Sequence, residues 1–579
     1  MKPSGPTTTS GFSYLRWVQI TWLSVLPVLV LGPVLFRAGY LLTFDMVWVP
    51  QLSMRPSFLG LGSGWPRAVP SDAVVAILDN LLPAMIIQKA LLYGALAAAG
   101  LGVAALLPHG NRKDMAAATV GATFYVWNPF VAERLVLGHW PVLLGHAALP
   151  WVLWCVRRIR ERRSGWGQLA GWLWLGSLSA SAGLVTAAVA LLALCRRRSR
   201  RTQLLVLVMV LAANSVWIIA GLMHWGLSID AAGFNAFAAR EEAGLPAPLA
   251  TLALGGIWNQ SVVPGSRDGV LVWLSLLLLQ VPMLLAARVW WRQTETWLRR
   301  TLVVAALLAW LIALLGWLLP SGLATLTHAF PPISLLRDGS RYLAPLALLE
   351  ACLLATAVGW MLERMRELRL VVVGFALLLP LFVMPDLAWG RMGSLLPVNY
   401  PKSYAQARAT VLQQQVAASD RTLILPFVSY RAPAWNRHWP VLDPMGRYLP
   451  TEYVANDALQ VSGKPIRGED PLAAAVAEQL ALKDPRSRAE GISELGIKLV
   501  VSDLDAGIPA DQVTGRVLLE SPAVRVQELA EGPDEGTTSP RPGSVVLLLT
   551  GWVAFAALAA TPGVAGLLWL WRGFRSTNR

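Results

Sequence analysis

Long apolar segments recur along this chain, and the loops between them are short and rich in arginine. A membrane-spanning helix needs about 20 consecutive apolar residues. Runs of that length occur at about residues 17–37, 82–107 and 203–223, so we predict a polytopic membrane protein. Charged residues make up 14% of the chain, against about 25% in soluble domains, which supports the same class.

The positive charge indicates how these segments are oriented. The formal net charge of +15 comes mainly from arginines in the loops between apolar runs, such as Arg157 and Arg158. Cytoplasmic loops of membrane proteins carry such an excess, so nucleic acid is not an expected partner. We predict about twelve segments in the plasma (inner) membrane, with both termini cytoplasmic. The remaining segments are expected at about 115–130, 140–156, 168–195 (two short helices), 269–287, 301–319, 343–362, 370–388 and 544–571.

Residues 168–195 lie between two arginine clusters and are too few for two full spans. A single span would put the clusters on opposite sides of the membrane, against the positive-inside rule. Two short helices that break within residues 177–183 keep both clusters on one side. Broken segments of this kind are tolerated where protein or a water-filled cavity covers them. We therefore expect a re-entrant hairpin, with the single span as the alternative.

Residues 389–541 are polar and rich in turns, unlike the polytopic part at 1–388. Residues 423–427 and 497–501 are typical of buried strands, and 471–482 and 487–495 of helices. Alternating strands and helices predict a small α/β domain that folds by itself. The number of preceding segments places it outside the membrane, before a last helix and cytoplasmic tail at 542–579. The expected fold class is mainly α, with this extracytoplasmic α/β domain near the C-terminus.

Asp45 follows the first apolar run directly and lies among Phe44, Met46 and Trp48. An apolar setting raises the pKa of a carboxylate or requires a partner for it, so Asp45 is a functional candidate. The alternative is a turn residue at the membrane interface. The same outer loop is expected to end in an amphipathic surface helix at residues 71–82.

Polar residues of several outer loops map to the same membrane face as Asp45, and twelve spans would bring those loops together. Each charge has the alternative of being a solvated loop residue. Arg337 and Arg341, four positions apart, share a face if helical, and arginine forks bind phosphate oxygens. Their alternative is an interfacial anchor. The other members of this set are Glu133, Arg134, His139, Glu241, Glu242 and Asp338.

No Walker loop, dinucleotide fingerprint, metal-ligand spacing or nucleophile elbow is present in the sequence. Instead, the chain resembles the GT-C superfamily of polyprenyl-phosphate-dependent glycosyltransferases, and within it actinobacterial arabinofuranosyltransferase-like and YfhO-type membrane proteins. The doubled acid of some GT-C enzymes is missing, because Met46 follows Asp45. The resemblance rests on residues 44–45, 127–130, 138–140, 149–151, 336–341, 425–427, 443–445, 495–497 and 500–501.

This resemblance implies transfer of a sugar from a polyprenyl-phosphate donor to an envelope glycan or glycolipid acceptor on the outer face. Asp45 is then the expected base, and Arg337 and Arg341 the donor-phosphate clamp. A divalent cation is the one cofactor that stays open. The supporting residues are Glu133, His139 and Asp338, and the acceptor candidates are Glu241, Glu242, Trp258 and Asn259.

Two other functions remain as alternatives. A lipid-linked-sugar flippase or transporter would need charges inside the spans, facing a pathway. The expected spans are nearly free of them, with Glu350 as the main exception. A non-catalytic envelope assembly protein would bind glycan through its outer domain, and Asp45 would be dispensable.

Overall fold

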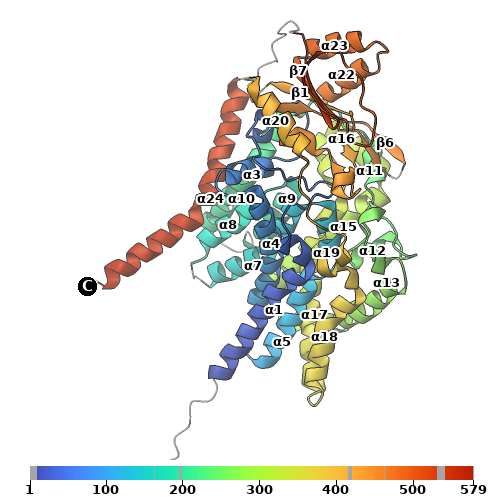
Figure 1. The fold of residues 1–579 in the computed structure, drawn as a ribbon. Helices are drawn as coiled ribbons and strands as arrows, with labels where there is room; N and C mark the ends of the chain where they lie inside the picture. The colour runs from blue at the N-terminus through green and yellow to red at the C-terminus, as the bar shows by residue number, and fades with distance from the viewer. Residues whose placement is uncertain are drawn as a thin grey trace, which may run out of the picture.

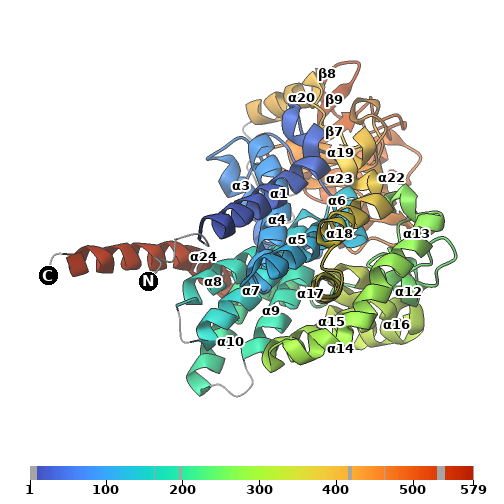
Figure 2. The same cartoon turned by 90° about the horizontal axis from the view of Figure 1, so that it is seen from below.

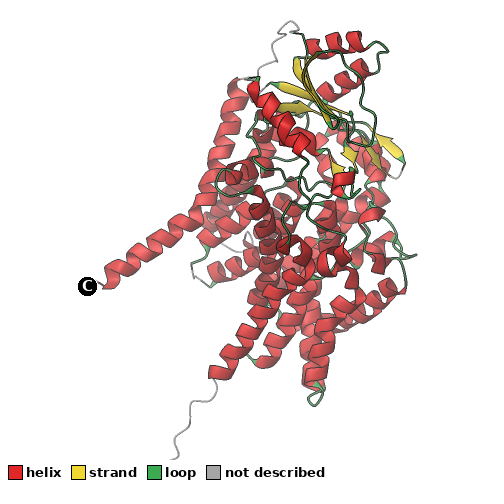
Figure 3. Ribbon diagram, viewed as in Figure 1, coloured by secondary structure: helices red, strands yellow, loops and turns green. Residues whose placement is uncertain are grey.

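The computed structural model describes residues 9–161, 164–194, 199–414, 420–461, 463–530 and 542–577. A helical body forms most of the molecule, and a small sheet with its helices lies at one end of it (Figures 1 and 3). The first half of the C-terminal helix packs on the body, where the Ser215 hydroxyl donates to the Gly551 carbonyl at 2.8 Å, and the helix then extends away from it (Figures 1 and 2).

Eight helical segments in the described part of the chain are long and apolar enough to cross a membrane. A bent pair at Arg369–Val383 and Pro385–Gly393 raises the number to nine if it counts as one span. The molecule is thus a multi-pass membrane protein, while the count of twelve stays a prediction. The eight segments belong to α1 (Thr9–Phe36), α4 (Ala84–Leu106), α7 (Trp140–Arg160), α10 (Arg200–Met223), α13 with α14 (Val270–Ser275 and Val281–Gln293, joined by a short π-helix), α15 (Thr296–Leu318), α17 (Ala344–Arg364) and α24 (Pro542–Thr577).

Shorter helices fill the spaces between the long ones. The expected span at 115–130 ends early, because the Asn128 side chain accepts from the Val131 N–H and Pro129 starts a new helix. The helix expected at residues 71–82 is present over Ser71–Asp79 as α3, and its position along the membrane surface stays a prediction. These helices are α2 (Pro56–Leu59), α3 (Ser71–Asp79), α5 (Arg112–Val126), α6 (Pro129–Leu137), α8 (Trp166–Gly176), α9 (Ala180–Leu194), α11 (Ala232–Ala236), α12 (Ala247–Leu252), α16 (Pro320–Ala329), α18 (Arg369–Val383) and α19 (Ala388–Gly393, left-handed at residues 389–392).

Helices α8 and α9 form the hairpin that we predicted for residues 168–195 from the arginine clusters on either side. They break at residues 177–179, and the Ser179 hydroxyl caps the second helix by accepting from the Ala182 N–H at 3.3 Å. Arg160, at the end of α7, donates to the carbonyl of Ala193 near the end of α9 at 3.3 Å. The start of α8 and the end of α9 therefore lie at the same end of the bundle, which excludes a single span. Residues 195–198, with part of the second arginine cluster, are outside the described residues.

The C-terminal layer contains a five-stranded mixed sheet of order β4-β1-β7-β9-β8. Strand β1 runs parallel to β4 and β7, whereas β9 is antiparallel to both its neighbours. The strands and helices predicted at 423–427, 497–501, 471–482 and 487–495 are confirmed as β1, β7, α22 and α23. The elements are α20 (Lys402–Gln413), β1 (Arg421–Leu425), β2 (Tyr430–Arg431), β3 (Val441–Leu442), α21 (Pro444–Tyr448), β4 (Glu452–Val454), β5 (Leu459–Val461), β6 (Lys464–Ile466), α22 (Pro471–Leu480), α23 (Pro485–Glu494), β7 (Ile497–Asp503), β8 (Arg516–Glu520) and β9 (Val524–Glu528).

The two faces of this sheet belong to different hydrophobic cores. Leu423 and Leu425 of β1 pack in a local core with α22 and α23, whereas Ile424 belongs to the main core shared with the helical body. Buried Arg55, from the loop after α1, also donates to the carbonyls of Gly446 at 3.0 Å and Leu449 at 2.7 Å. These contacts hold the layer on the body. Folding of residues 400–540 in isolation stays a prediction.

Candidate active site

A cavity of about 1570 Å³ lies between the helical body and the C-terminal layer. Its walls come from the loop after α1, the α6–α7 turn, the tip of the α8–α9 hairpin, the loop before α17 and residues 428–470. Glu133, Glu241 and Glu242 lie outside this lining. The predicted site residues that line it are Asp45, His139, Trp258, Asn259, Arg337, Asp338 and Arg341.

The backbone around Asp45 is locked against the end of α6. The Asp45 N–H donates to the Leu137 carbonyl at 3.1 Å, and the Thr43 hydroxyl donates to the Val136 carbonyl at 2.7 Å. Gly138 has φ +85°, and a Cβ there would collide with the backbone nitrogen of Met46. A glycine is therefore required where the two loops meet.

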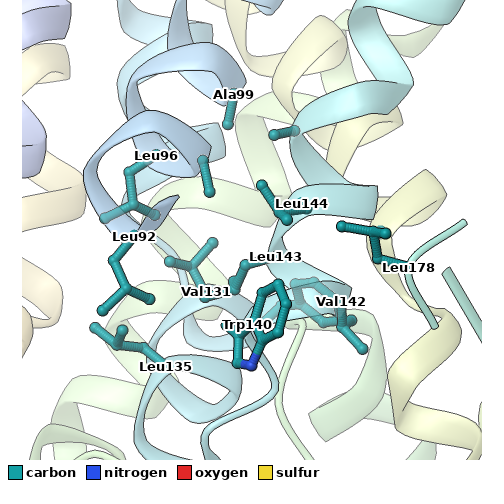
Figure 4. Close-up of a cluster of buried hydrophobic side chains, with 14 of the residues drawn as sticks. Leu92, Leu96, Ala99, Val131, Leu135, Trp140, Val142, Leu143, Leu144 and Leu178 are labelled. Atoms are coloured by element: carbon teal, nitrogen blue, oxygen red, sulfur yellow. The ribbon is translucent and has the colours of Figure 1, made fainter. Parts of the chain in front are cut away.

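Short helix α6 is held by apolar packing on both sides. Figure 4 shows Val131 and Leu135 of α6 in one buried cluster with Leu92 and Leu96 of α4 and Leu143 of α7. His139 lies in the turn between α6 and α7. Because close-packed cores resist deformation, this turn is a rigid support for a functional side chain.

Both carboxylate oxygens of Asp45 have partners. Oδ2 lies 3.1 Å from His139 Nε2, and the Tyr430 hydroxyl donates to Oδ1. The side chain is 37% exposed, within the cavity. Burial alone would raise the pKa of Asp45, but the hydrogen bonds from His139 and Tyr430 and the charge of Arg341 lower it below the ordinary value. Asp45 is therefore an ionised carboxylate near neutral pH.

His139 lies between two arginines. Arg134 Nη1 lies 3.0 Å from Nδ1, and Arg341 Nη2 lies 3.2 Å from Nε2. Burial, followed by the positive charge of Arg341, lowers the pKa of His139 to about 4 even though Asp45 favours the charged form. His139 is therefore neutral near pH 7.

Asp338 orients Arg341 and is itself enclosed. Its Oδ2 accepts from Arg341 Nε at 2.7 Å, and its Oδ1 accepts from the Ser340 hydroxyl at 2.7 Å. Arg134 in turn donates to the Ser340 hydroxyl at 2.6 Å. Burial opposes ionisation of Asp338, but the charges of Arg341 and Arg134 lower its pKa well below the ordinary value. About a third of the Arg341 side chain (36%) stays exposed to the cavity.

Arg337 and Arg341 do not share a helical face, because the chain breaks at residues 337–338 between two 3₁₀ helices, Pro331–Leu336 and Gly339–Tyr342. Arg337 instead donates to Glu469 Oε1 at 2.6 Å, and Arg67 donates to Glu469 Oε2 at 2.8 Å. These three side chains and Arg341 line the same cavity. Glu469 of the C-terminal layer thus connects the segment between α1 and α3 with the loop before α17.

Glu133 and Glu242 form a separate buried group. Glu242 pairs with Arg267 and accepts from the Gly256 N–H, which holds the loop after α11 in place. Burial and the neighbouring charge of Glu242 raise the pKa of Glu133 well above its ordinary value. Glu241 is exposed, away from the cavity. The structure therefore does not bring these three acids into the cavity beside Asp45.

Sequence reasoning missed Tyr430, Arg67 and Glu469. Tyr430 reaches Asp45 across 385 positions, and Arg337 reaches Glu469 across 132. Nothing local to these residues signals such pairing. In the part of the chain that the structure describes, no group of three or more His, Cys, Asp and Glu side chains is placed to hold a metal ion.

The chain is similar to known proteins in its three-dimensional fold. No protein-family model matches the chain, and no curated protein matches it by sequence. A cryo-EM structure of arabinofuranosyltransferase AftD from Mycobacteria is similar with a TM-score of 0.55 and 18% identity, over 90% of this chain and 40% of that one. A mutant form of AftD is similar with a TM-score of 0.54 and 17% identity, over 92% and 42%. The chain thus spans about two fifths of the length of AftD and shares its fold over that part.

Proposed function

We propose that this chain is a membrane glycosyltransferase that moves a sugar from a polyprenyl-phosphate donor to an envelope glycan or glycolipid acceptor. The observation that carries this proposal is the meeting of Asp45 and Arg341 at one atom, His139 Nε2, with contacts of 3.1 and 3.2 Å. A carboxylate able to accept a proton and a guanidinium able to bind phosphate therefore face one cavity, side by side. The fold shared with an arabinofuranosyltransferase supports this reaction class.

The chemistry is displacement at the anomeric carbon of the donor sugar. The acceptor oxygen forms the new bond to that carbon while its proton passes to Asp45. The bond between the carbon and the phosphate oxygen breaks, and the phosphate leaves with the electron pair. Arg341 lies where it stabilises the added negative charge on the phosphate. Asp338 keeps the Arg341 fork aimed, because it occupies Nε at 2.7 Å.

Arg337 takes a secondary part in donor binding. Its Nη1 is bonded to Glu469, so a phosphate must share Arg337 with that carboxylate or displace it. Arg341 faces the cavity more openly than Arg337, with side chains 36% and 19% exposed. We therefore assign the principal phosphate contact to Arg341.

The lining of the cavity suits the other parts of the two substrates. Trp217, Ile218 and Leu222 of α10 give it an apolar wall for a polyprenyl chain. Trp258 packs edge-on against Phe237, with ring centroids 4.7 Å apart, and offers an aromatic surface for an acceptor sugar. We propose that this end of the molecule faces the outside of the plasma membrane and that both termini are cytoplasmic.

The test is turnover by the purified full chain in lipid nanodiscs. The probes are a radiolabelled polyprenyl-phosphate arabinofuranose and a short arabinan acceptor, with a polyprenyl-phosphate hexose as the second donor. Release of polyprenyl phosphate together with extension of the acceptor supports the proposal. Failure to bind or consume either donor would overturn it and would favour the transporter or assembly alternatives.

A further inference from the structure

The Arg134 guanidinium is fully buried, and its position controls how His139 can form hydrogen bonds. It donates to Ser340 at 2.6 Å, and its Nη1 lies 3.0 Å from His139 Nδ1 and 3.5 Å from Asp338 Oδ2. A guanidinium has donors and no acceptor. His139 Nδ1 must therefore present its lone pair to Arg134 and carry no hydrogen.

The protonation state of the other ring nitrogen, Nε2, follows from this restriction. A neutral imidazole has one N–H, so the hydrogen of His139 is on Nε2. Nε2 lies 3.1 Å from Asp45 Oδ2, which accepts this hydrogen. Arg341 Nη2, 3.2 Å from Nε2, then contacts the ring without a hydrogen bond to it. A hydrogen on Nδ1 would instead create two mismatches, a donor against the Arg134 donor and a lone pair against the Asp45 carboxylate. An imidazolium would place a second N–H on Nδ1, directly against the Arg134 donor.

We propose that Arg134 and His139 are positioning residues that hold Asp45 as a hydrogen-bond acceptor, and that His139 never takes the proton of the reaction. This proposal rests on the proposed function, in which Asp45 is the base. The proton from the acceptor hydroxyl then stays on Asp45 until solvent in the cavity removes it. In a proton relay, by contrast, the histidine would take the proton and become positively charged.

The charges around His139 agree with this direction. Arg134 faces Nδ1 from α6, Arg341 faces Nε2 from the 3₁₀ turn before α17, and Asp45 faces Nε2 from the first outer loop. Asp338, between the two arginines, also favours a charged His139. Burial and the two arginines outweigh the two carboxylates, so the pKa of His139 is about 4.

The first test reads the tautomer and needs no substrate. The full chain, labelled with ¹⁵N-histidine in nanodiscs, contains six histidines, and subtraction of the His139→Gln spectrum assigns His139. We expect an unprotonated Nδ1 and a protonated Nε2 from pH 8 to pH 5. An Nδ1-protonated tautomer, or an imidazolium at pH 7, would overturn the proposal whether or not the protein is active.

The second test separates positioning from proton transfer. Glutamine accepts through its carbonyl oxygen and donates through its amide, so it can replace both hydrogen bonds of His139 but cannot take a proton. We expect His139→Leu to lower kcat by at least about 100-fold, and His139→Gln to recover most of that loss with an unchanged pH profile. Equal losses for the two variants, both well folded, would show that His139 carries the proton. Inactivity of the parent would count against the proposed function, while the tautomer measurement would still decide this proposal.

Discussion

The Tyr430 hydroxyl donates a hydrogen bond to Oδ1 of Asp45, across 385 positions of the chain. Asp45 belongs to the loop that follows the first membrane helix, and Tyr430 belongs to β2 of the C-terminal layer. The candidate base is therefore held from both sides of the cavity, by His139 of the helical body and by Tyr430 of the layer. A chain without the C-terminal layer would lack half of this arrangement.

Removal of the Asp45 charge tests the central residue. Asp45→Asn keeps the size of the side chain but removes the base, so we expect transfer to fall by about 10²–10⁴-fold. Folding should survive, because an amide is less costly to bury than a carboxylate. Turnover in nanodiscs and the thermal unfolding midpoint are measured together. Asp268→Asn is the control, because Asp268 is exposed, in the loop before α13, and lies outside the cavity lining. Parent-level transfer by Asp45→Asn would remove Asp45 from catalysis.

Replacement of the Arg341 fork tests the phosphate contact. Arg341→Lys keeps the charge but loses the bidentate geometry and the bond to Asp338, so donor binding should weaken by about tenfold or more. Arg525→Lys is the matched control, because Arg525 pairs with Glu520 on the far strands of the sheet. Arg67 is unsuitable as a control, since it lines the cavity and binds Glu469. Equal donor affinities for the Arg341 and Arg525 variants would refute the assignment.

Loss of the Tyr430 hydroxyl should change the pH dependence of the reaction. The hydrogen bond from Tyr430 favours the ionised form of Asp45, so Tyr430→Phe raises the pKa of Asp45. Activity depends on the carboxylate, and the acid limb of the kcat/KM profile should therefore move to higher pH. The stability that the lowered pKa of Asp45 contributes is present above its ordinary pKa and is lost as pH falls through the folded value. Tyr93→Phe, remote in α4, should leave the profile in place, and a shift of the Tyr430→Phe profile toward lower pH would contradict this account.

Gly138 is expected to be intolerant of a side chain. An alanine there must adopt φ +85° and push against the backbone of Met46, at a cost of roughly 1–3 kcal/mol in the free energy of unfolding. Because the displaced loop carries Asp45, transfer should fall as well. Gly94→Ala in α4 meets no atom within 4 Å and should be neutral or slightly stabilising. Denaturation of both variants checks the difference, and equal stabilities would show that the two loops do not pack so closely.

The hairpin makes a prediction about accessibility. In a background without Cys155, Cys195 and Cys352, Ser179→Cys should react with a membrane-impermeant reagent from the same side as Arg525→Cys in the C-terminal layer. Ser179 lines the same cavity as Tyr430 and Glu469 of the C-terminal layer. Arg200→Cys should react only from the opposite side, because the end of α9 lies beside Arg160 of α7. Labelling of residue 200 from the side of residue 525 would contradict the hairpin. Every loop after residue 200 would then face the side of the membrane opposite to the predicted one.

The membrane class, the positions of most long helices and the α8–α9 hairpin were all predictable from the sequence. These features depend on apolar runs about one membrane thickness long and on where the arginines lie, both of which are local properties of the chain. The strands β1 and β7 and the helices α22 and α23 were predictable for the same reason. Asp45, His139 and Arg341 were predicted as candidates from their loops, but without their mutual contacts.

The choice of polar residues that share the cavity depends on how the chain packs in three dimensions. Glu133 and Glu242 came from the same set of loops as Asp45, yet they are buried away from it beside Arg267. Arg67, Tyr430 and Glu469 carried no local signal, and they meet at the site because the C-terminal layer docks on the loops between α1 and α3. Ion pairs and hydrogen bonds act over a few ångströms in space and are indifferent to separation along the chain. Their partners were therefore fixed by helix packing and by the docking of the layer, which no local pattern of residues records.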